Sequence, residues 1–232
     1  MIITKWYMNM KNSGSIVKPK DYFLSLFEKY GVDEKSLGWS KHKQKFRFRQ
    51  VCSYVDNGNS VLDIGCGFAD LYDYLASHYR NIEYYGVDIM SEYIDVALSK
   101  YNEENVHLCC ATIDNLPWKR KYDWVIECGL FGLRQFDDDK MYEYIDETLR
   151  KALDLSEIGV SFNFMSDKVD YMTSDTDFHV SPEKILSIAY KYSRRIVLDN
   201  SILPFEYSIT VWKNDSFAKE TTVFRDVEGI QP

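Results

Sequence analysis

From Ser60 onward the chain alternates short apolar runs with longer amphipathic stretches. Short apolar runs are typical of buried strands, whereas stretches with apolar residues three and four apart are typical of helices packed on a sheet. Strands that are joined through helices pair in parallel, with right-handed crossovers. The alternation therefore predicts an α/β fold: a doubly wound, mostly parallel seven-stranded sheet with helices on both faces.

The spacing of the apolar runs also predicts the direction of the last strand. Only residues 199–205 separate the last two predicted strands, too few for a crossover helix, so the final strand should be antiparallel. The predicted helices include one that begins at Ser91 as its cap and one opened by Ser181-Pro182-Glu183. The predicted strands are 61–64, 82–87, 106–110, 122–128, 160–165, 195–198 and 206–212.

The segment before the alternation predicts an N-terminal helical extension. One helix is expected over 21–30 and a second over 40–54, with Phe46, Val51 and Tyr54 facing inward. The resulting organisation has three parts. They are a helical extension or lid over 1–56, a ligand-binding domain over 57–213, and a flexible tail without a clear period over 214–232.

Charge is spread unevenly along the chain. The net charge is −8, yet residues 1–50 hold eleven basic residues against four acidic ones. The acidic remainder repels a phosphate backbone, which disfavours nucleic acid as a partner. The basic segment is compatible with attraction of an anionic substrate, but the favoured interpretation is a solvated helical face that pairs loosely with the acidic domain.

The five cysteines have no paired spacing, and no histidine cluster accompanies them, so we expect reduced thiols and no metal site. The first residues lack the apolar run of a signal peptide, and no stretch of about 18 apolar residues is present to span a membrane. These features predict a cytoplasmic protein.

A glycine turn follows the first predicted strand. In doubly wound sheets ligands bind beyond the carboxyl ends of the strands, and Asp63-Ile64-Gly65-Cys66-Gly67 lies there. Glycines let the backbone turn sharply and approach a ligand closely. Asp88 ends the second strand, where a carboxylate accepts hydrogen bonds from ribose hydroxyls. Together, the glycine turn and Asp88 predict a cofactor that contains adenosine.

The position after the turn distinguishes between such cofactors. The dinucleotide fingerprint G-x-G-x-x-G has a third glycine where this chain has Asp70, and a carboxylate there repels a pyrophosphate. S-adenosylmethionine carries a sulfonium and an ammonium instead, which nearby carboxylates complement. An NAD-dependent oxidoreductase and a noncatalytic module that binds an adenosine cofactor remain the alternatives.

Residues 38–212 resemble the class I S-adenosylmethionine-dependent methyltransferases, which share a Rossmann-like fold. The resemblance rests on the glycine turn, on Asp88 with Ile89, on Thr112 to Pro117 and on Tyr122 to Gly129. Ala69 replaces a frequent third glycine, a change expected to have little steric consequence. The resemblance implies contacts to S-adenosylmethionine from Asp63, Gly65, Cys66, Gly67, Asp88, Ile89, Thr112, Ile113, Asp114, Glu127, Cys128 and Gly129.

Gly38-Trp39-Ser40, with Gln44, Arg47 and Phe48, is similar to the N-terminal helix of a bacterial subgroup of these enzymes. The similarity implies that Arg47 pairs with the cofactor carboxylate. The alternative for Arg47 is a surface cation.

Methyl transfer is an in-line displacement that depends mainly on proximity and alignment, and a base is needed only for acceptors such as hydroxyls. Signatures of amino-methylating and pyrimidine-methylating nucleic-acid enzymes are absent from the sequence, which favours a small-molecule acceptor and leaves a protein or a modified nucleotide as the alternatives. Candidate bases near the expected strand ends are Glu127, Asp167, His179 and Glu206. Candidate substrate contacts are Trp39, Phe131, Asn163 and Tyr171.

Overall fold

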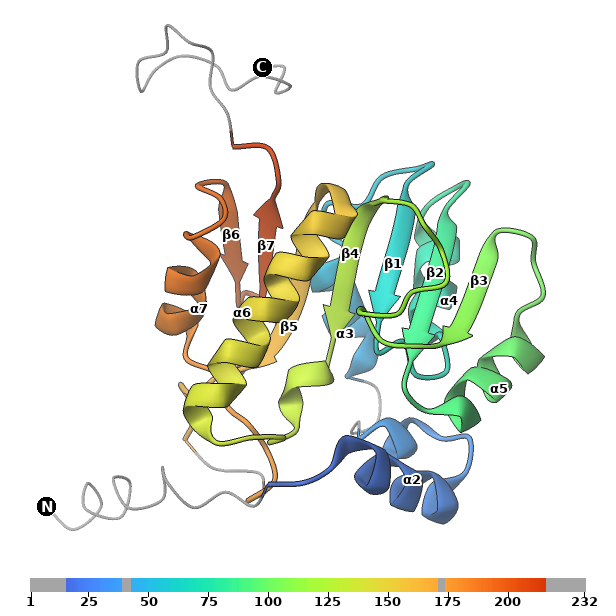
Figure 1. The fold of residues 1–232 in the computed structure, drawn as a ribbon, viewed down its shortest axis with the longest axis horizontal. Helices are drawn as coiled ribbons and strands as arrows, with labels where there is room; N and C mark the ends of the chain where they lie inside the picture. The colour runs from blue at the N-terminus through green and yellow to red at the C-terminus, as the bar shows by residue number, and fades with distance from the viewer. Residues whose placement is uncertain (1–15, 39–42, 171–173, 216–232) are drawn as a thin grey trace, which may run out of the picture.

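A seven-stranded sheet forms the centre of the computed structural model, which describes residues 16–38, 43–170 and 174–215 (Figure 1). The strand order is β3-β2-β1-β4-β5-β7-β6, in which β7 runs antiparallel to the other six strands of the described sheet. The predicted fold class and the antiparallel last strand are confirmed. The strands are β1 (Ser60–Ile64), β2 (Glu83–Asp88), β3 (Val106–Cys110), β4 (Tyr122–Cys128), β5 (Ser156–Met165), β6 (Ile196–Asp199) and β7 (Glu206–Trp212).

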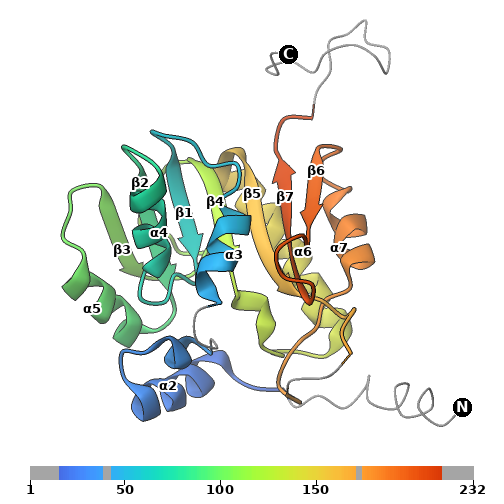
Figure 2. The same ribbon diagram turned by 180° about the vertical axis from the view of Figure 1, so that it is seen from behind.

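Helices cover both faces of the sheet (Figures 1 and 2). On one face α3 (Gln44–Val51), α4 (Asp70–His78) and α5 (Ser91–Lys100) enclose one apolar core. On the other, α6 (Asp138–Leu155) and α7 (Pro182–Ala189) enclose a second. Every residue of β1 is buried, as expected for a central strand covered on both faces.

Side chains cap two of these helices, and of these the cap at Ser181 was predicted. Asp137 accepts a hydrogen bond from the Lys140 amide at the start of α6, and Ser181 accepts one from the Lys184 amide at the start of α7. The predicted cap at Ser91 is wrong, because Ser91 is already the first helical residue and follows Met90 as the cap residue.

Helix α3 departs from its predicted length and orientation. It begins at Gln44 and ends at Val51, and residues 39–42 lie outside the described residues. Val51 is buried as predicted, but Phe46 and Tyr54 are 48% and 41% exposed, so the predicted inward face is wrong. Arg47 is buried instead, because its guanidinium pairs with Glu206 of β7 and thereby sets the rotation of the helix.

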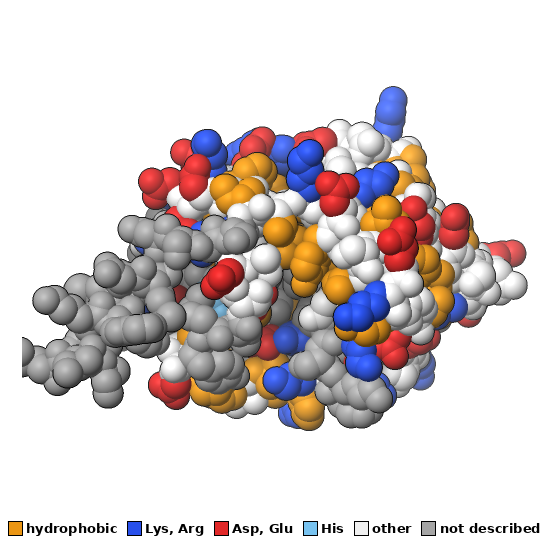
Figure 3. Space-filling model, turned by 90° about the horizontal axis from the view of Figure 1, so that it is seen from below, with side chains coloured by type: hydrophobic (Ala, Val, Ile, Leu, Met, Phe, Trp, Pro, Cys, Tyr) orange, Lys and Arg blue, Asp and Glu red, His pale blue; other side chains and the backbone are white. Residues whose placement is uncertain are grey.

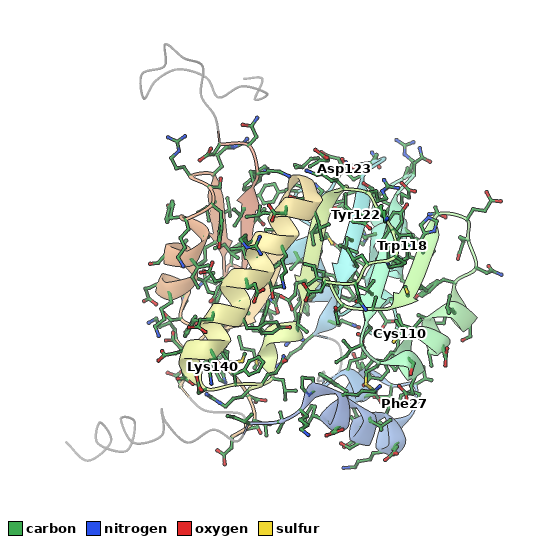
Figure 4. All side chains as sticks on the ribbon, in the orientation of Figure 1. Phe27, Cys110, Trp118, Tyr122, Asp123 and Lys140 are labelled. Carbon is green, nitrogen blue, oxygen red and sulfur yellow. The ribbon has the colours of Figure 1, made fainter. Side chains whose placement is uncertain are left out.

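Helix α2 (Pro19–Tyr30) and the short 3-10 helix η1 (Glu34–Leu37) lie below the carboxyl ends of the parallel strands (Figure 1). Phe27, labelled in Figure 4, is on the side of α2 that faces α5, where its ring centroid lies 5.7 Å from that of Tyr93. The Tyr93 hydroxyl also donates to the Ser36 carbonyl at 2.6 Å. The predicted N-terminal helix is therefore present and closes one end of the molecule, whereas the predicted tail lies outside the described residues from 216 on.

Candidate functional site

A cavity of about 500 Å³ opens at the carboxyl ends of β1, β2 and β4, between the sheet, α2 and α6. Figure 3 views this end of the molecule, where the surface is hollowed between apolar and basic side chains. The cavity is where ligands bind in a doubly wound sheet. Its walls include Asp63 and Gly67 from the first turn, Asp88 from β2, and Cys128 with Gly129 after β4.

The glycine turn lies between α4 and the N-terminal helices. Gly65 and Gly67 have φ angles of 74° and 55°, in the left-handed region that favours glycine. A Cβ at Gly67 would lie 2.8 Å from a methyl carbon of Leu37. The Gly67 amide donates to Asp88 Oδ2 at 2.9 Å. The turn is therefore fixed to β2 and leaves no room for a side chain beneath η1.

Ala69 is strained at the end of this turn. Its φ of 60° and ψ of 29° are left-handed, a conformation that costs an L residue with a Cβ roughly 1–2 kcal/mol. The expectation that alanine at this position has little steric consequence is therefore wrong. The cause is its place at the cap of α4, where the chain reverses direction into the helix.

Asp63 brings a buried carboxylate to the cavity wall. It is 3% exposed, and the Tyr84 hydroxyl donates to its Oδ2 at 2.6 Å. Burial raises the pKa of Asp63 to about 7; the Tyr84 hydrogen bond opposes this rise, and Asp88 and Asp70 add to it. A cation in the cavity would favour the charged form of this carboxylate.

Asp88 is also buried, and both of its oxygens accept backbone hydrogen bonds. The Gly67 amide donates to Oδ2 and the Met90 amide donates to Oδ1, each at 2.9 Å. Burial raises the pKa of Asp88, while these amides lower it. Each carboxylate oxygen keeps a second lone pair, so Asp88 is held in place and still able to accept from a ligand.

Asp70 occupies the first turn of α4, where a pyrophosphate would bind in a dinucleotide site. Its carboxylate lies 3.0 Å from Lys100 Nζ. A carboxylate already sits at the positive end of this helix, so the site suits a ligand without phosphate.

A second cavity, of about 390 Å³, adjoins the first. Phe23, Leu37 and Gly129 line both cavities. The rest of the second cavity comes from α2, from Arg47 of α3, from the turn after β4, from the end of β5, and from the segments that follow β5 and precede β7. The two cavities therefore meet where β4 ends.

Comparison with known proteins gives a consistent result. Residues 61–152 match the family described as methyltransferase domain. A Mycobacterium tuberculosis protein whose name marks it as a methyltransferase is 27% identical over 159 residues, which cover 66% of this chain and 93% of the relative.

Residues 61–152 therefore form a methyltransferase domain, and together with this relative they support a class I S-adenosylmethionine-dependent methyltransferase. Its cofactor is S-adenosylmethionine, and neither alternative activity finds support.

Solved structures agree with this methyltransferase in fold. One is a chain from the complex of the Haloferax volcanii Trm112 methyltransferase activator with a methyltransferase. It has a TM-score of 0.61 and 14% identity, and the match covers 84% of this chain and 99% of that chain. Another is magnesium protoporphyrin IX methyltransferase from Synechocystis PCC 6803 with bound S-adenosylmethionine, with a TM-score of 0.52, 14% identity and 91% coverage of both chains.

The first cavity of the methyltransferase brings together most of the residues predicted to contact the cofactor. They come from the ends of β1, β2, β3 and β4, far apart in sequence and adjacent at one edge of the sheet. The predicted residues that line it are Asp63, Gly65, Cys66, Gly67, Asp88, Ile89, Thr112, Ile113, Asp114, Cys128 and Gly129.

Two predicted cofactor residues lie elsewhere. Arg47 is buried on the second cavity and pairs with Glu206, so it is not a surface cation. Glu127 is fully buried behind the wall, and its Oε1 accepts a hydrogen bond from the Leu130 amide. Burial raises the pKa of Glu127 to about 8, with the Leu130 and Asn163 amides acting in the opposite direction. Glu127 thus holds the turn after β4.

The residues predicted to contact the acceptor or to act as its base lie in different parts of the structure. Asn163, His179 and Glu206 line the second cavity, where Asn163 Nδ2 donates to the Tyr207 carbonyl at 3.3 Å. Phe131 is fully buried, with its ring stacked on that of Phe164 at 5.5 Å, so it faces the core. Asp167 is outside both linings in the described part of the chain. Trp39 and Tyr171 lie outside the described residues.

Sequence reasoning missed the wall contributed by α6. Tyr144, Thr148 and Lys151 face the first cavity, and Lys151 Nζ lies 2.6 Å from Asp114 Oδ1. These positions are four and three residues apart and so share one face of the helix. That spacing was the signal available, although it does not reveal which face meets a ligand.

Within the described residues, no helix has the length and apolar character needed to cross a membrane.

Proposed function

We propose that this methyltransferase transfers the methyl group of S-adenosylmethionine to a small molecule that binds in the second cavity. The observation that carries the proposal is the junction of the two cavities at Gly129. Methyl transfer requires the acceptor atom in line with the carbon–sulfur bond, so the cofactor and the acceptor need adjoining pockets.

The first cavity fits the cofactor by its donor set. Asp63 supplies a buried negative charge for the ammonium and sulfonium groups, and Asp88 supplies a fixed acceptor for the ribose hydroxyls. For adenine, Ile89 and Ile113 offer apolar contacts, and Thr112 and Asp114 offer polar ones. The methionine part lies along the glycine turn and Gly129. When bound, the cofactor supplies the electrophilic methyl group.

We assign residues 1–56 to a helical extension whose described part forms a lid, and 57–213 to the cofactor-binding domain. The lid assignment rests on Phe23 of α2 and Leu37 of η1, which line both cavities. Excluding water from the site favours displacement at the methyl carbon over side reactions.

The size of the second cavity and the net charge of the chain support a small acceptor. Its volume of about 390 Å³ is in the range of small-molecule pockets. The chain carries a net charge of −8, which opposes binding of nucleic acid.

All five cysteines are free thiols, which is consistent with a cytoplasmic location.

Incubation with methyl-labelled S-adenosylmethionine and a cell extract tests the proposal. We expect label in the small-molecule fraction, identified by mass spectrometry, and less label at a limiting cofactor concentration when Asp88→Ala replaces the wild type. Label that appears in the protein or nucleic-acid fraction would contradict a small-molecule acceptor. Failure of S-adenosylhomocysteine to bind in calorimetry would instead contradict the assignment of the first cavity.

A further inference from the structure

The segment Asp177–Val180 crosses the wall of the second cavity in an extended conformation. Asp177 pairs with Leu133 as an isolated bridge, and Val180 pairs with Ser166 as another. The Phe178 amide donates to the Gly132 carbonyl at 2.9 Å, and the Val180 amide donates to the Met165 carbonyl at 2.7 Å. Backbone hydrogen bonds on both sides therefore fix this segment between the chain after β4 and the end of β5.

Side chains along this segment alternate between the core and the cavity. Phe178 and Val180 are 1% and 0% exposed and belong to the core beneath α6. Asp177 and His179 line the second cavity. Successive residues of an extended chain point to opposite sides, so the anchoring of Phe178 and Val180 directs His179 into the cavity.

The histidine ring has one engaged nitrogen and one available nitrogen. His179 Nδ1 lies 2.7 Å from the Ser166 carbonyl oxygen, which can only accept, so Nδ1 carries the proton. His179 Nε2 is buried and has no hydrogen-bond partner among the described residues. In this tautomer Nε2 presents a lone pair, which is the form of a base ready to receive a proton.

Other ionisable groups on the cavity wall constrain the acceptor. Arg47 and Glu206 form an ion pair, so their charges offset each other. Lys43 and Asp177 add one charge of each sign, and Tyr22 adds a phenol. Much of the remaining wall is apolar, with Leu133, Met165, Val169, Leu203, Pro204 and Phe205. This balance fits an uncharged acceptor with an apolar body.

We propose that His179 is the general base of the methyl transfer and that the acceptor is an uncharged hydroxyl compound with an apolar body. The inference rests on the proposed function of the two cavities. The acceptor O–H bond breaks and its proton moves to Nε2. An oxygen electron pair forms the new bond to the methyl carbon as the carbon–sulfur bond breaks and leaves its electrons on sulfur. The products are a methyl ether, S-adenosylhomocysteine and an imidazolium, which returns its proton to solvent.

The test compares phenol, thiophenol and aniline as probes with methyl-labelled cofactor. The variant His179→Asn keeps an amide in place of Nδ1–H and removes Nε2, and His78→Asn at the exposed end of α4 is the matched control. In mildly alkaline buffer thiophenol is already ionised, whereas phenol is not. We expect His179→Asn to lose about 100-fold or more of kcat with phenol and less than about threefold with thiophenol, because only phenol needs the base.

Four outcomes would overturn the inference. One is equal loss with phenol and thiophenol in His179→Asn, which would indicate a structural role. The others are an equal loss in His78→Asn, transfer by the wild type only to thiophenol or aniline, and transfer to none of the three probes. Calorimetry with S-adenosylhomocysteine distinguishes failure of this inference from failure of the proposed function. If the wild type binds S-adenosylhomocysteine but does not methylate phenol, the role proposed for His179 is wrong. If the wild type does not bind S-adenosylhomocysteine, the proposed function itself is wrong.

Discussion

The two cavities differ in how the chain builds them. The first is lined largely by residues at the ends of consecutive strands, each within a short motif such as Asp63 to Gly67. The second is assembled from α2, α3, the turn after β4, and the segments around His179 and Glu206. The cofactor pocket is thus a property of the sheet, whereas the acceptor pocket depends on how distant segments pack over it. We expect substitutions in the two regions to have different signatures.

The largest expected effect is on the acceptor side. Arg47→Met removes the partner of Glu206, whose side chain is 13% exposed, and leaves a buried carboxylate. We expect the free energy of unfolding to fall by about 3–5 kcal/mol in urea denaturation. The double variant Arg47→Met with Glu206→Leu should recover most of this loss. A single variant as stable as the wild type would show that the pair does not hold α3 in place.

On the cofactor side, Asp88→Ala should weaken binding of S-adenosylhomocysteine by about 1–3 kcal/mol, because a hydrogen-bond acceptor is lost. Calorimetry measures it. The control is Asp123→Ala, which removes a carboxylate at the opposite end of β4 (Figure 4), where Asp123 accepts from the Ser60 amide. Equal effects of the two variants on cofactor affinity would mean that Asp88 acts only through stability.

The pKa of Asp63 predicts two pH dependences of opposite sign. The cofactor cation needs the carboxylate, so affinity should fall about tenfold for each pH unit below about 7. The stability of the free protein should change with pH in the opposite direction. The pKa of Asp63 is raised from an ordinary value of 3.8, so its contribution to stability is full below about 4 and is lost as pH rises through about 7.

Calorimetry and thermal melting between mildly acidic and mildly alkaline pH measure these two trends. Glu127, with its pKa raised to about 8, adds to the loss of stability with the same sign. Asp63→Asn should flatten the affinity profile. An unchanged profile in that variant would assign the pH dependence to another group.

The smallest expected effect concerns the strained cap of α4. Ala69→Gly should raise the free energy of unfolding by about 0.5–1 kcal/mol, because glycine adopts a φ of 60° without a Cβ penalty. Urea denaturation measures the change. Cofactor affinity should stay the same, since the strain lies in the fold. A destabilised variant would show that the alanine methyl contributes more through packing than it costs in strain.

The sequence predicted the parts of the molecule that local pattern determines. Strands 106–110, 122–128 and 206–212 match the structure in both bounds, because each is a short segment rich in apolar residues. The glycine turn and Asp88 were also predicted correctly, because each lies in a short motif at the end of a predicted strand. Arg47 and Phe46 were misjudged because an ion pair to a distant strand sets the rotation of α3. Distant pairing of this kind leaves no periodic signal in the sequence.

Phe23 and Leu37 belong to a single pair of helices and yet form part of both cavities. A ligand in either cavity therefore adds contacts that hold this pair of helices against the sheet, and a second ligand then meets a site that is already ordered. Such an arrangement couples the two binding equilibria, and the coupling is reciprocal. The cofactor and the acceptor are expected to bind cooperatively, and their products to leave through the same opening of the N-terminal helices.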